Sequence, residues 1–207
     1  MPDNTYNNSY NYAANPFIYT DTADGTRRLT IYDNMLARRE LSVAGSIDAA
    51  MAFSLCHYLR YLEQQDPQTP VTVFVSSSGG EVAAGLAIYD ALRTISCPIT
   101  TVCTDRAMSM GSIVFMAGEE RLMYPHAELL IHDPLIPTGA GGSACAVQEV
   151  SRQLMRVRRT LNTILAERSG LSLKRVQQMT GNETRLPAGR AVELGFATST
   201  ISSRKVA

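Results

Sequence analysis

The strongest constraint on the fold is an alternation of β-rich runs with helical runs in the middle of the chain. The β-rich run 71–75 leads into a serine-rich segment that ends in a diglycine at 79–80, and a helical pattern then continues up to Pro98. A second apolar run, 99–103, is followed by another helical run that ends at Gly118. Strands that alternate with helices favour a sheet of parallel strands joined by right-handed crossovers. The sequence therefore predicts an α/β fold of repeated strand-helix units.

Length and charge narrow the class of protein. The chain has 207 residues, which suits one domain of ordinary size, and its 19 basic and 19 acidic side chains cancel. No run of basic residues suggests a nucleic-acid surface. No apolar run approaches the ~20 residues of a membrane span, and the N-terminus lacks the pattern of a secretory signal. We expect a cytoplasmic protein with neither a nucleic-acid nor a membrane partner.

The two ends of the chain differ from its middle. Residues 1–16 are rich in Asn and Tyr and contain almost no aliphatic side chains, so they cannot bury enough apolar surface to offset the entropy of ordering. We interpret them as a disordered leader or a removable propeptide, and residues 202–207 as a loose tail. Between these ends the sequence predicts a single domain over residues 17–201.

The four cysteines do not have the spacing of a metal site. Two of them, Cys56 and Cys103, lie inside apolar elements, where a reduced thiol behaves as a small hydrophobic group. We expect all four to be reduced, as is usual for cytosolic proteins. No metal site is predicted from them.

A long apolar stripe marks the last third of the chain, after a Pro- and Gly-rich loop at 134–143. Its residues recur at alternating spacings of three and four, which is typical of a narrow seam along one helix. Such a helix could lie on the core of its own domain, but a long and narrow stripe favours packing against another copy. The stripe consists of Val147, Val150, Leu154, Val157, Leu161 and Ile164.

One serine stands where the strand 99–103 gives way to a helical run. Ser109 lies between two methionines and is followed by Gly111, so a strand-to-helix turn is predicted there. A serine at such a turn presents its hydroxyl close to a helix N-terminus, whose N–H groups stabilise negative charge. Ser109 is therefore a candidate nucleophile.

A serine nucleophile needs a base, and the chain has three histidines. His57 falls in the middle of a predicted helix, and His126 follows a proline in a predicted turn. His132 follows the apolar strand 129–131, so its ring can emerge at a strand end beside other strand ends. A lone histidine at such a place is more often structural than catalytic, but His132 is the best candidate base.

The diglycine could help to form an oxyanion hole beside Ser109 and His132. A tetrahedral oxyanion requires two backbone N–H groups aimed at one point, and glycine allows a close approach of the backbone. Gly80, at a predicted helix start, could supply one N–H group, and Met110, directly after the serine, could supply the other. A diglycine by itself more often marks a simple turn.

In their order and spacing, several motifs resemble the proteolytic subunit of the Clp protease, the ClpP family of serine peptidases. The resemblance extends from about residue 19 to residue 201 and implies the fold of the ClpP/crotonase superfold. The motifs that carry it are Arg28-Leu29-Thr30-Ile31-Tyr32, Ser77-Ser78-Gly79-Gly80, Ala84-Gly85-Leu86-Ala87-Ile88-Tyr89-Asp90, Met108-Ser109-Met110-Gly111, Ile131-His132-Asp133-Pro134 and Ala191-Val192-Glu193-Leu194-Gly195.

The resemblance implies a role for each of these site residues. Ser109 would be the nucleophile, His132 the general base, and Gly80 and Met110 the oxyanion-hole amides. The apolar stripe would belong to a protruding handle, about residues 134–170, through which two heptameric rings stack. A partner AAA+ ATPase would use ATP to unfold proteins and thread them into the chamber, where they are cut to short peptides. The subunit itself would need no cofactor.

Three departures from the family pattern keep a second reading open. The family's acid is usually Asp, whereas the matching residue is Glu183, with Asn182 beside it. Ser78 replaces the usual proline before the diglycine. The surface pocket that receives ATPase loops also loses aromatic side chains, because its matching positions are Thr72, Phe74, Thr94 and Ile201.

These departures favour, as an alternative to a fully active peptidase, a weakly active or regulatory ring subunit that pairs with a second ClpP isoform. Acyl-CoA chemistry on the same superfold is a third hypothesis, because it also uses diglycine-type oxyanion holes. The presence of a serine nucleophile with a histidine base disfavours it.

Overall fold

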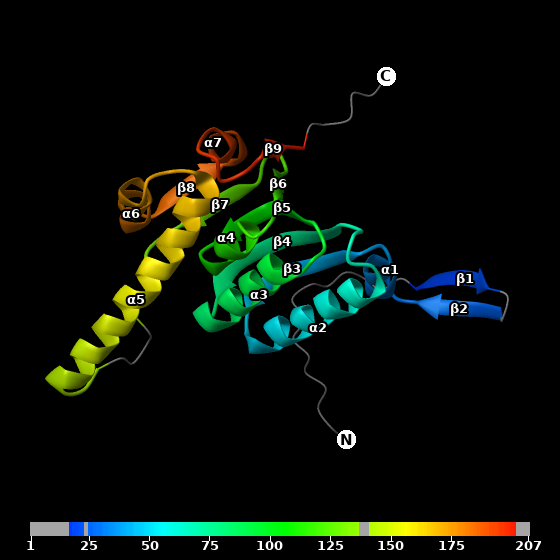
Figure 1. The fold of residues 1–207 in the computed structure, drawn as a ribbon, viewed down its shortest axis with the longest axis horizontal. Coiled ribbons are helices and arrows are strands. Elements are labelled where there is room, and N and C mark those ends of the chain that lie inside the picture. The colour runs from blue at the N-terminus through cyan, green and yellow to red at the C-terminus, as the bar shows by residue number, and fades with distance from the viewer. Residues whose placement is uncertain (1–16, 23–24, 137–140, 202–207) are drawn as a thin grey trace. The chain divides into compact units, whose positions relative to one another are not determined.

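The structure, a computed structural model, describes residues 17–22, 25–136 and 141–201 (Figure 1). It divides into two compact units, Met1–Arg39 and Glu40–Ala207, which are described separately. The expected leader at 1–16 and the tail at 202–207 lie outside the described residues, as does part of the expected loop at 134–143. A single domain over 17–201 stays a prediction.

The first unit is a hairpin followed by a short helix. Strands β1 (Ile18–Thr22) and β2 (Gly25–Leu29) pair in antiparallel fashion, and helix α1 (Ile31–Ala37) follows. Thr30 caps the helix: its Oγ1 accepts the Asp33 N–H at 3.0 Å, and the Asp33 carboxylate accepts the Thr30 N–H at 2.8 Å. This reciprocal pair satisfies two backbone donors at the helix start.

The second unit contains a seven-stranded sheet in the order β3-β4-β5-β6-β9, with β7 paired to β5 and β8 paired to β7. Every pairing is parallel except that of β7 with β8. This arrangement confirms the predicted α/β class. The strands are β3 (Glu40–Ile47), β4 (Val71–Gly80), β5 (Ile99–Met108), β6 (Glu120–Met123), β7 (Glu128–Ile131), β8 (Thr184–Pro187) and β9 (Ser199–Thr200).

Six helices follow the strands of this unit in the part of the chain that the structure describes. Helix α2 packs on α3, α3 packs on α4, and α4 packs on β4 and β5, so the short α4 is enclosed by other elements. The helices are α2 (Ala49–Gln65), α3 (Val82–Thr94), α4 (Met110–Phe115), α5 (Ala144–Ser169), α6 (Leu173–Gly181) and α7 (Ala188–Glu193).

Both central strands are longer than their apolar runs. The run 71–75 continues through the serines and the diglycine as one strand, β4, and the run 99–103 continues to Met108 as β5. Pairing with neighbouring strands extends them, because Ile47 of β3 lies opposite Gly80, and Met108 lies opposite Leu130 of β7. The diglycine and the residue before Ser109 are therefore strand ends.

Helix α5 is divided into an exposed and a buried half. Its second half packs into the unit through Leu161, Ile164 and Leu165, which are buried. Its first half projects from the rest of this unit (Figure 1) and leaves Val147 exposed. The predicted handle helix is thus one continuous element.

None of the four cysteines, all of which lie in the described residues, forms a disulfide. Cys97 and Cys103 are buried, whereas Cys145 is exposed. Burial, assisted by the nearby Asp105 carboxylate, raises the pKa of the Cys103 thiol to about 12, so this thiol is protonated at neutral pH.

Candidate active site

Strand pairing brings Ser109 and His132 to the same edge of the sheet. The last residue of β5, Met108, lies opposite Leu130 of β7, and the Ser109 N–H donates to the Leu130 carbonyl at 2.8 Å. His132 directly follows Ile131, the last residue of β7. Because the two strands are parallel, both end at this edge, and the serine and the histidine follow those ends.

Glu183 lies at the start of the neighbouring strand. Strand β8 runs antiparallel to β7 with Thr184 opposite Ile131, so Glu183 and His132 occupy the next positions beyond that pair. Glu183 is exposed and has a φ of 48°, and its N–H donates to the Thr180 carbonyl at 3.3 Å. A turn at the end of α6 therefore places the backbone of Glu183 at the start of β8, beside the end of β7.

Ser109 has a strained backbone. Its φ of 53° and ψ of −122° place it in a region that side-chain-bearing residues rarely adopt, at a cost of roughly 1–3 kcal/mol. Its carbonyl accepts both the N–H and the hydroxyl of Ser112, at 3.0 and 2.6 Å. This sharp strand-to-helix turn is the geometry that exposes a nucleophilic hydroxyl above a sheet edge.

The end of β4 approaches this turn so closely that only glycine fits. A Cβ on Gly79, whose φ is 103°, would lie 2.7 Å from the Ser109 Cβ and 2.9 Å from the Met108 carbonyl oxygen. A Cβ on Gly80, whose φ is 152°, would overlap the backbone of Ile47. The diglycine therefore places its backbone directly beside the serine.

The hydrogen bonds around the diglycine single out one N–H group. The Gly79 N–H donates to Ser77 Oγ at 3.0 Å, and the Glu81 N–H donates to the Ile47 carbonyl at 2.9 Å. The N–H groups on both sides of Gly80 thus have partners away from the cavity. Of these three N–H groups, that of Gly80 therefore stays the candidate donor to a developing oxyanion.

Met110 begins helix α4, directly after the serine. The first N–H groups of a helix have no partner within it, and the Ser109 side chain makes no capping hydrogen bond. The Met110 side chain is buried against α3, where a Cβ on Gly85 would lie 2.5 Å from the Met110 Cε. Packing thus fixes the residue whose N–H faces the serine turn.

The ring of His132 is bound to its own chain. Its Nδ1 lies 2.6 Å from the Asp133 carbonyl oxygen, which can only accept, so Nδ1 carries the proton. In a neutral ring with its proton on Nδ1, Nε2 is the acceptor, which is the tautomer that a base for serine requires. Among the described residues, no hydrogen bond joins His132 to Ser109 or to Glu183.

Most of the residues predicted for the active site line one cavity of about 510 Å³. Ser109, His132, Gly80 and Met110 all line it, whereas Glu183 is not among its described lining residues. The other wall is apolar and comes largely from α5. Its residues are Ile113, Ile131, Val150, Leu154, Val157, Leu161 and Leu165.

The sequence alone does not predict this wall, because the spacing of the stripe on α5 does not say what the stripe contacts. Val150, Leu154, Val157 and Leu161 belong to the stripe that was expected to pack on the core or on another copy. In the described structure they border the cavity.

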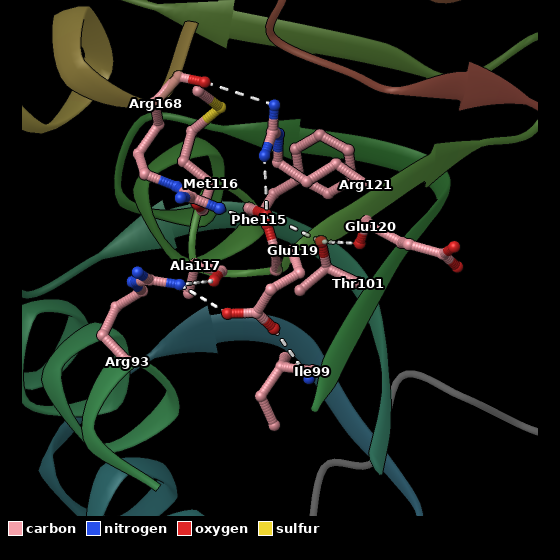
Figure 2. Close-up of polar contacts among 11 residues, drawn as sticks. Arg93, Ile99, Thr101, Phe115, Met116, Ala117, Glu119, Glu120, Arg121 and Arg168 are labelled. Atoms are coloured by element: carbon pink, nitrogen blue, oxygen red, sulfur yellow. Dashed lines mark hydrogen bonds and ion pairs between the residues drawn. The ribbon is translucent and has the colours of Figure 1, made fainter. Parts of the chain in front are cut away.

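The far end of α4, with the turn that follows it up to Gly118, is held by side chains from other elements (Figure 2). The carbonyls of four successive residues, 115–118, each accept a hydrogen bond from a side chain. Thr101 donates to Phe115 at 2.7 Å, Arg168 donates to Met116 at 2.9 Å, and Arg93 donates to Ala117 at 3.3 Å. The Gly118 carbonyl accepts from both Arg168 and Arg121, at 2.6 and 3.1 Å.

Arg121 is the most buried of the three arginines of this cluster, with 7% of the residue exposed. Besides Gly118, its guanidinium donates to the carbonyls of Phe196, Arg168 and Gly195, at 2.9 to 3.2 Å. Burial, followed by repulsion from Arg168 and Arg93, lowers the pKa of Arg121 from its ordinary value. Four carbonyl oxygens offset that cost, two of which, those of Arg168 and Gly195, lie in the last turn of α5 and directly after α7.

The family model described as Clp protease matches residues 23–204 of the chain. The α/β fold and this match together define a ClpP-type protease, and the chain belongs to the Clp protease family. Membership implies a serine peptidase that acts on protein substrates and assembles into oligomeric rings. In the part of the chain that the structure describes, no helix is both long and apolar enough to cross a membrane.

Proposed function

We propose that this chain is the proteolytic subunit of an ATP-dependent protease and that it hydrolyses peptide bonds through an acyl-enzyme on Ser109. The observation that carries the proposal is the cavity that Ser109, His132, Gly80 and Met110 line together. Nucleophile, base and two amide donors around one space are what acyl transfer requires.

In the proposed mechanism, the Ser109 hydroxyl attacks the peptide carbonyl carbon while His132 Nε2 takes its proton. The N–H groups of Gly80 and Met110 hold the oxyanion. Collapse of the tetrahedral species breaks the C–N bond, and His132 gives its proton to the leaving amine. A water molecule then attacks the acyl-enzyme by the same route and releases the second peptide.

We assign Glu183 as the third member of the triad. The pairing of Thr184 with Ile131 supports this role, because it makes Glu183 and His132 the next residues along β8 and β7. Stabilising the imidazolium requires the Nδ1–H to turn from the Asp133 carbonyl toward a carboxylate. Asn182, also exposed and adjacent to Glu183, could orient the ring but would not stabilise its charge.

The substrates would be unfolded proteins delivered by an AAA+ ATPase, which uses the ATP, so the subunit needs no cofactor. We further propose heptameric rings that stack through α5, in the cytoplasm. The projecting first half of α5 supports this assembly, because it leaves Val147 and Met155 exposed. The apolar wall of the cavity favours an apolar side chain on the substrate.

The test is covalent labelling of the assembled protein with a fluorophosphonate, followed by mass-spectrometric mapping of the modified peptide. We expect modification of Ser109 and loss of both labelling and peptide hydrolysis in Ser109→Ala. Ser54→Ala, at an exposed position on α2, is the matched control and should label like the wild type. A label on another residue, or none in any oligomeric form, would refute the proposal.

A second candidate is a weakly active or regulatory ring subunit that pairs with another ClpP isoform. The resting hydrogen bond of His132 to the Asp133 carbonyl, with Glu183 exposed, favours it. Peptidase activity is measured for the isolated protein and then with a companion ring whose own serine is mutated. Activity that arises only in the mixed assembly would favour this second function.

A further inference from the structure

An ion pair lies directly behind the histidine. Arg158 of α5 donates from Nε to Asp133 Oδ2 at 2.7 Å, and Asp133 is the residue that follows His132. The two side chains are 25% and 35% exposed, so water screens this pair less than it screens a pair on the open surface. The second carboxylate oxygen, Oδ1, is buried and has no hydrogen-bond partner among the described residues. Arg158 is therefore the main anchor of the Asp133 side chain.

The backbone of Asp133 is held on both sides. Its N–H donates to the Thr180 carbonyl of α6 at 3.0 Å, and its own carbonyl accepts the His132 Nδ1 proton at 2.6 Å. Residue 133 thus joins α5, α6 and the imidazole ring. The orientation of the ring depends on where the Asp133 carbonyl is held.

We propose that Arg158 and Asp133 are positioning residues for the proposed base. By anchoring Asp133, Arg158 keeps its carbonyl at the His132 Nδ1–H in the resting state, so that Nε2 is already the acceptor for the Ser109 proton before the Glu183 carboxylate takes over the Nδ1–H. The inference rests on the proposed role of His132. In the resting structure the Asp133 carbonyl fixes the His132 tautomer. In a formed triad, the acid residue does this instead.

The pair also neutralises a carboxylate one residue from the ring. Without Arg158, the half-buried carboxylate would lose its partner and turn toward water, which removes one of the three restraints on residue 133 and leaves its carbonyl less firmly placed. A displacement of about 1 Å at a reacting group can cost on the order of 100-fold in rate. A purely structural pair would instead alter folding or assembly and leave the rate of serine attack unchanged in the assembled protein.

The experiment measures the rate of fluorophosphonate labelling of Ser109, together with kcat and KM for a peptide, on the full-length assembled protein. The variants are Asp133→Asn, Arg158→Met, the double variant and Arg158→Lys. We expect each of the first two to lower the labelling rate and kcat by roughly 10- to 100-fold, with KM within about twofold of the wild type. The double variant should be no slower than the worse single variant, because each residue acts through the other.

Arg158→Lys should recover part of the rate, since an ammonium can still pair with the carboxylate. Arg159→Met is the matched control: Arg159 is the next residue of α5, is exposed, and forms no ion pair with the described residues. It should label at the wild-type rate. If Arg158→Met fails to assemble, Arg158→Lys and Asp133→Asn carry the comparison.

Labelling at the wild-type rate in both single variants would overturn the inference, as would losses that multiply in the double variant. A fall in melting temperature without a fall in labelling rate would show a structural role only. These results leave the proposed function intact. A wild-type protein that never labels would instead overturn the proposed function and this inference together.

Discussion

The two ends of helix α4 are built in opposite ways. At its start, Ser109 has a strained backbone, makes no side-chain cap and faces the cavity. At its far end, the carbonyls of residues 115–118 are each bound by a side chain from another element (Figure 2). The end proposed to do chemistry has no side-chain cap, and the opposite end is fixed by many side-chain contacts.

The shortness of α4 makes this difference important. A helix leaves its first four N–H groups and its last four carbonyls without internal partners, so a helix of six residues depends almost entirely on outside partners. Arg93, Arg121 and Arg168 bring positive charge to the carbonyl end, where the helix dipole is negative. We infer that this end holds α4 rigidly enough for the strain at Ser109 to persist.

Removing Arg121 should cost more stability than removing any other side chain of this cluster. Arg121→Met leaves the carbonyls of Phe196, Arg168 and Gly195 without their buried donor, whereas the Gly118 carbonyl keeps its hydrogen bond from Arg168. At about 1 kcal/mol for each carbonyl left without a donor, we expect a loss of about 3 kcal/mol. Urea unfolding at fixed protomer concentration measures it. Arg106→Met, in the exposed pair with Asp105, is the control and should cost under about 1 kcal/mol. A loss below about 1 kcal/mol in Arg121→Met would show that this end is not held by the guanidinium.

The proposed reactive end could be predicted from sequence because its residues stand at strand ends in short motifs. Ser109, His132, Gly80 and Met110 each follow or end an apolar run, and the parallel sheet then brings those ends together. Glu183 was proposed only from the resemblance, because β8 is too short to give a clear pattern. The pairing of β8 with β7 gives that proposal a geometric basis.

The fixed end could not be predicted in this way. Thr101, Arg121 and Arg168 are far apart in the chain, and each binds a backbone carbonyl, which carries no sequence signal. The contact between His132 and the Asp133 carbonyl could not be predicted either, because it too is made to a backbone carbonyl. Side-chain motifs predicted the candidate chemistry, whereas side-chain-to-backbone contacts required the folded chain.

The strain at Ser109 predicts a smaller effect, in which one substitution is more stable than another. Ser109→Ala and Ser109→Gly should both abolish peptide hydrolysis, but glycine adopts a φ of 53° without penalty. The glycine variant should therefore be more stable than the alanine variant by about 1 kcal/mol, a difference that thermal unfolding of the two can measure. Equal stabilities would mean that the turn at Ser109 stores no strain. The start of α4 would then not differ from its far end in backbone strain.

The smallest effect is expected at the exposed edge of the fixed end. Arg93 pairs with Glu119 at 2.6 Å, but the two side chains are 33% and 54% exposed, so the pair should contribute on the order of 0.5 kcal/mol or less. Glu119→Gln keeps one oxygen that can accept the Ile99 N–H, and it replaces the oxygen that pairs with Arg93 by an NH2 group, so the ion pair is lost. Its melting temperature should lie close to that of the wild type, and the remaining difference should vanish in about 1 M salt, where screening is nearly complete. The cost of Arg121→Met should persist in the same salt, because buried hydrogen bonds are not screened. If Glu119→Gln were as damaging as Arg121→Met, the exposed ion pair rather than the buried guanidinium would hold the end of α4.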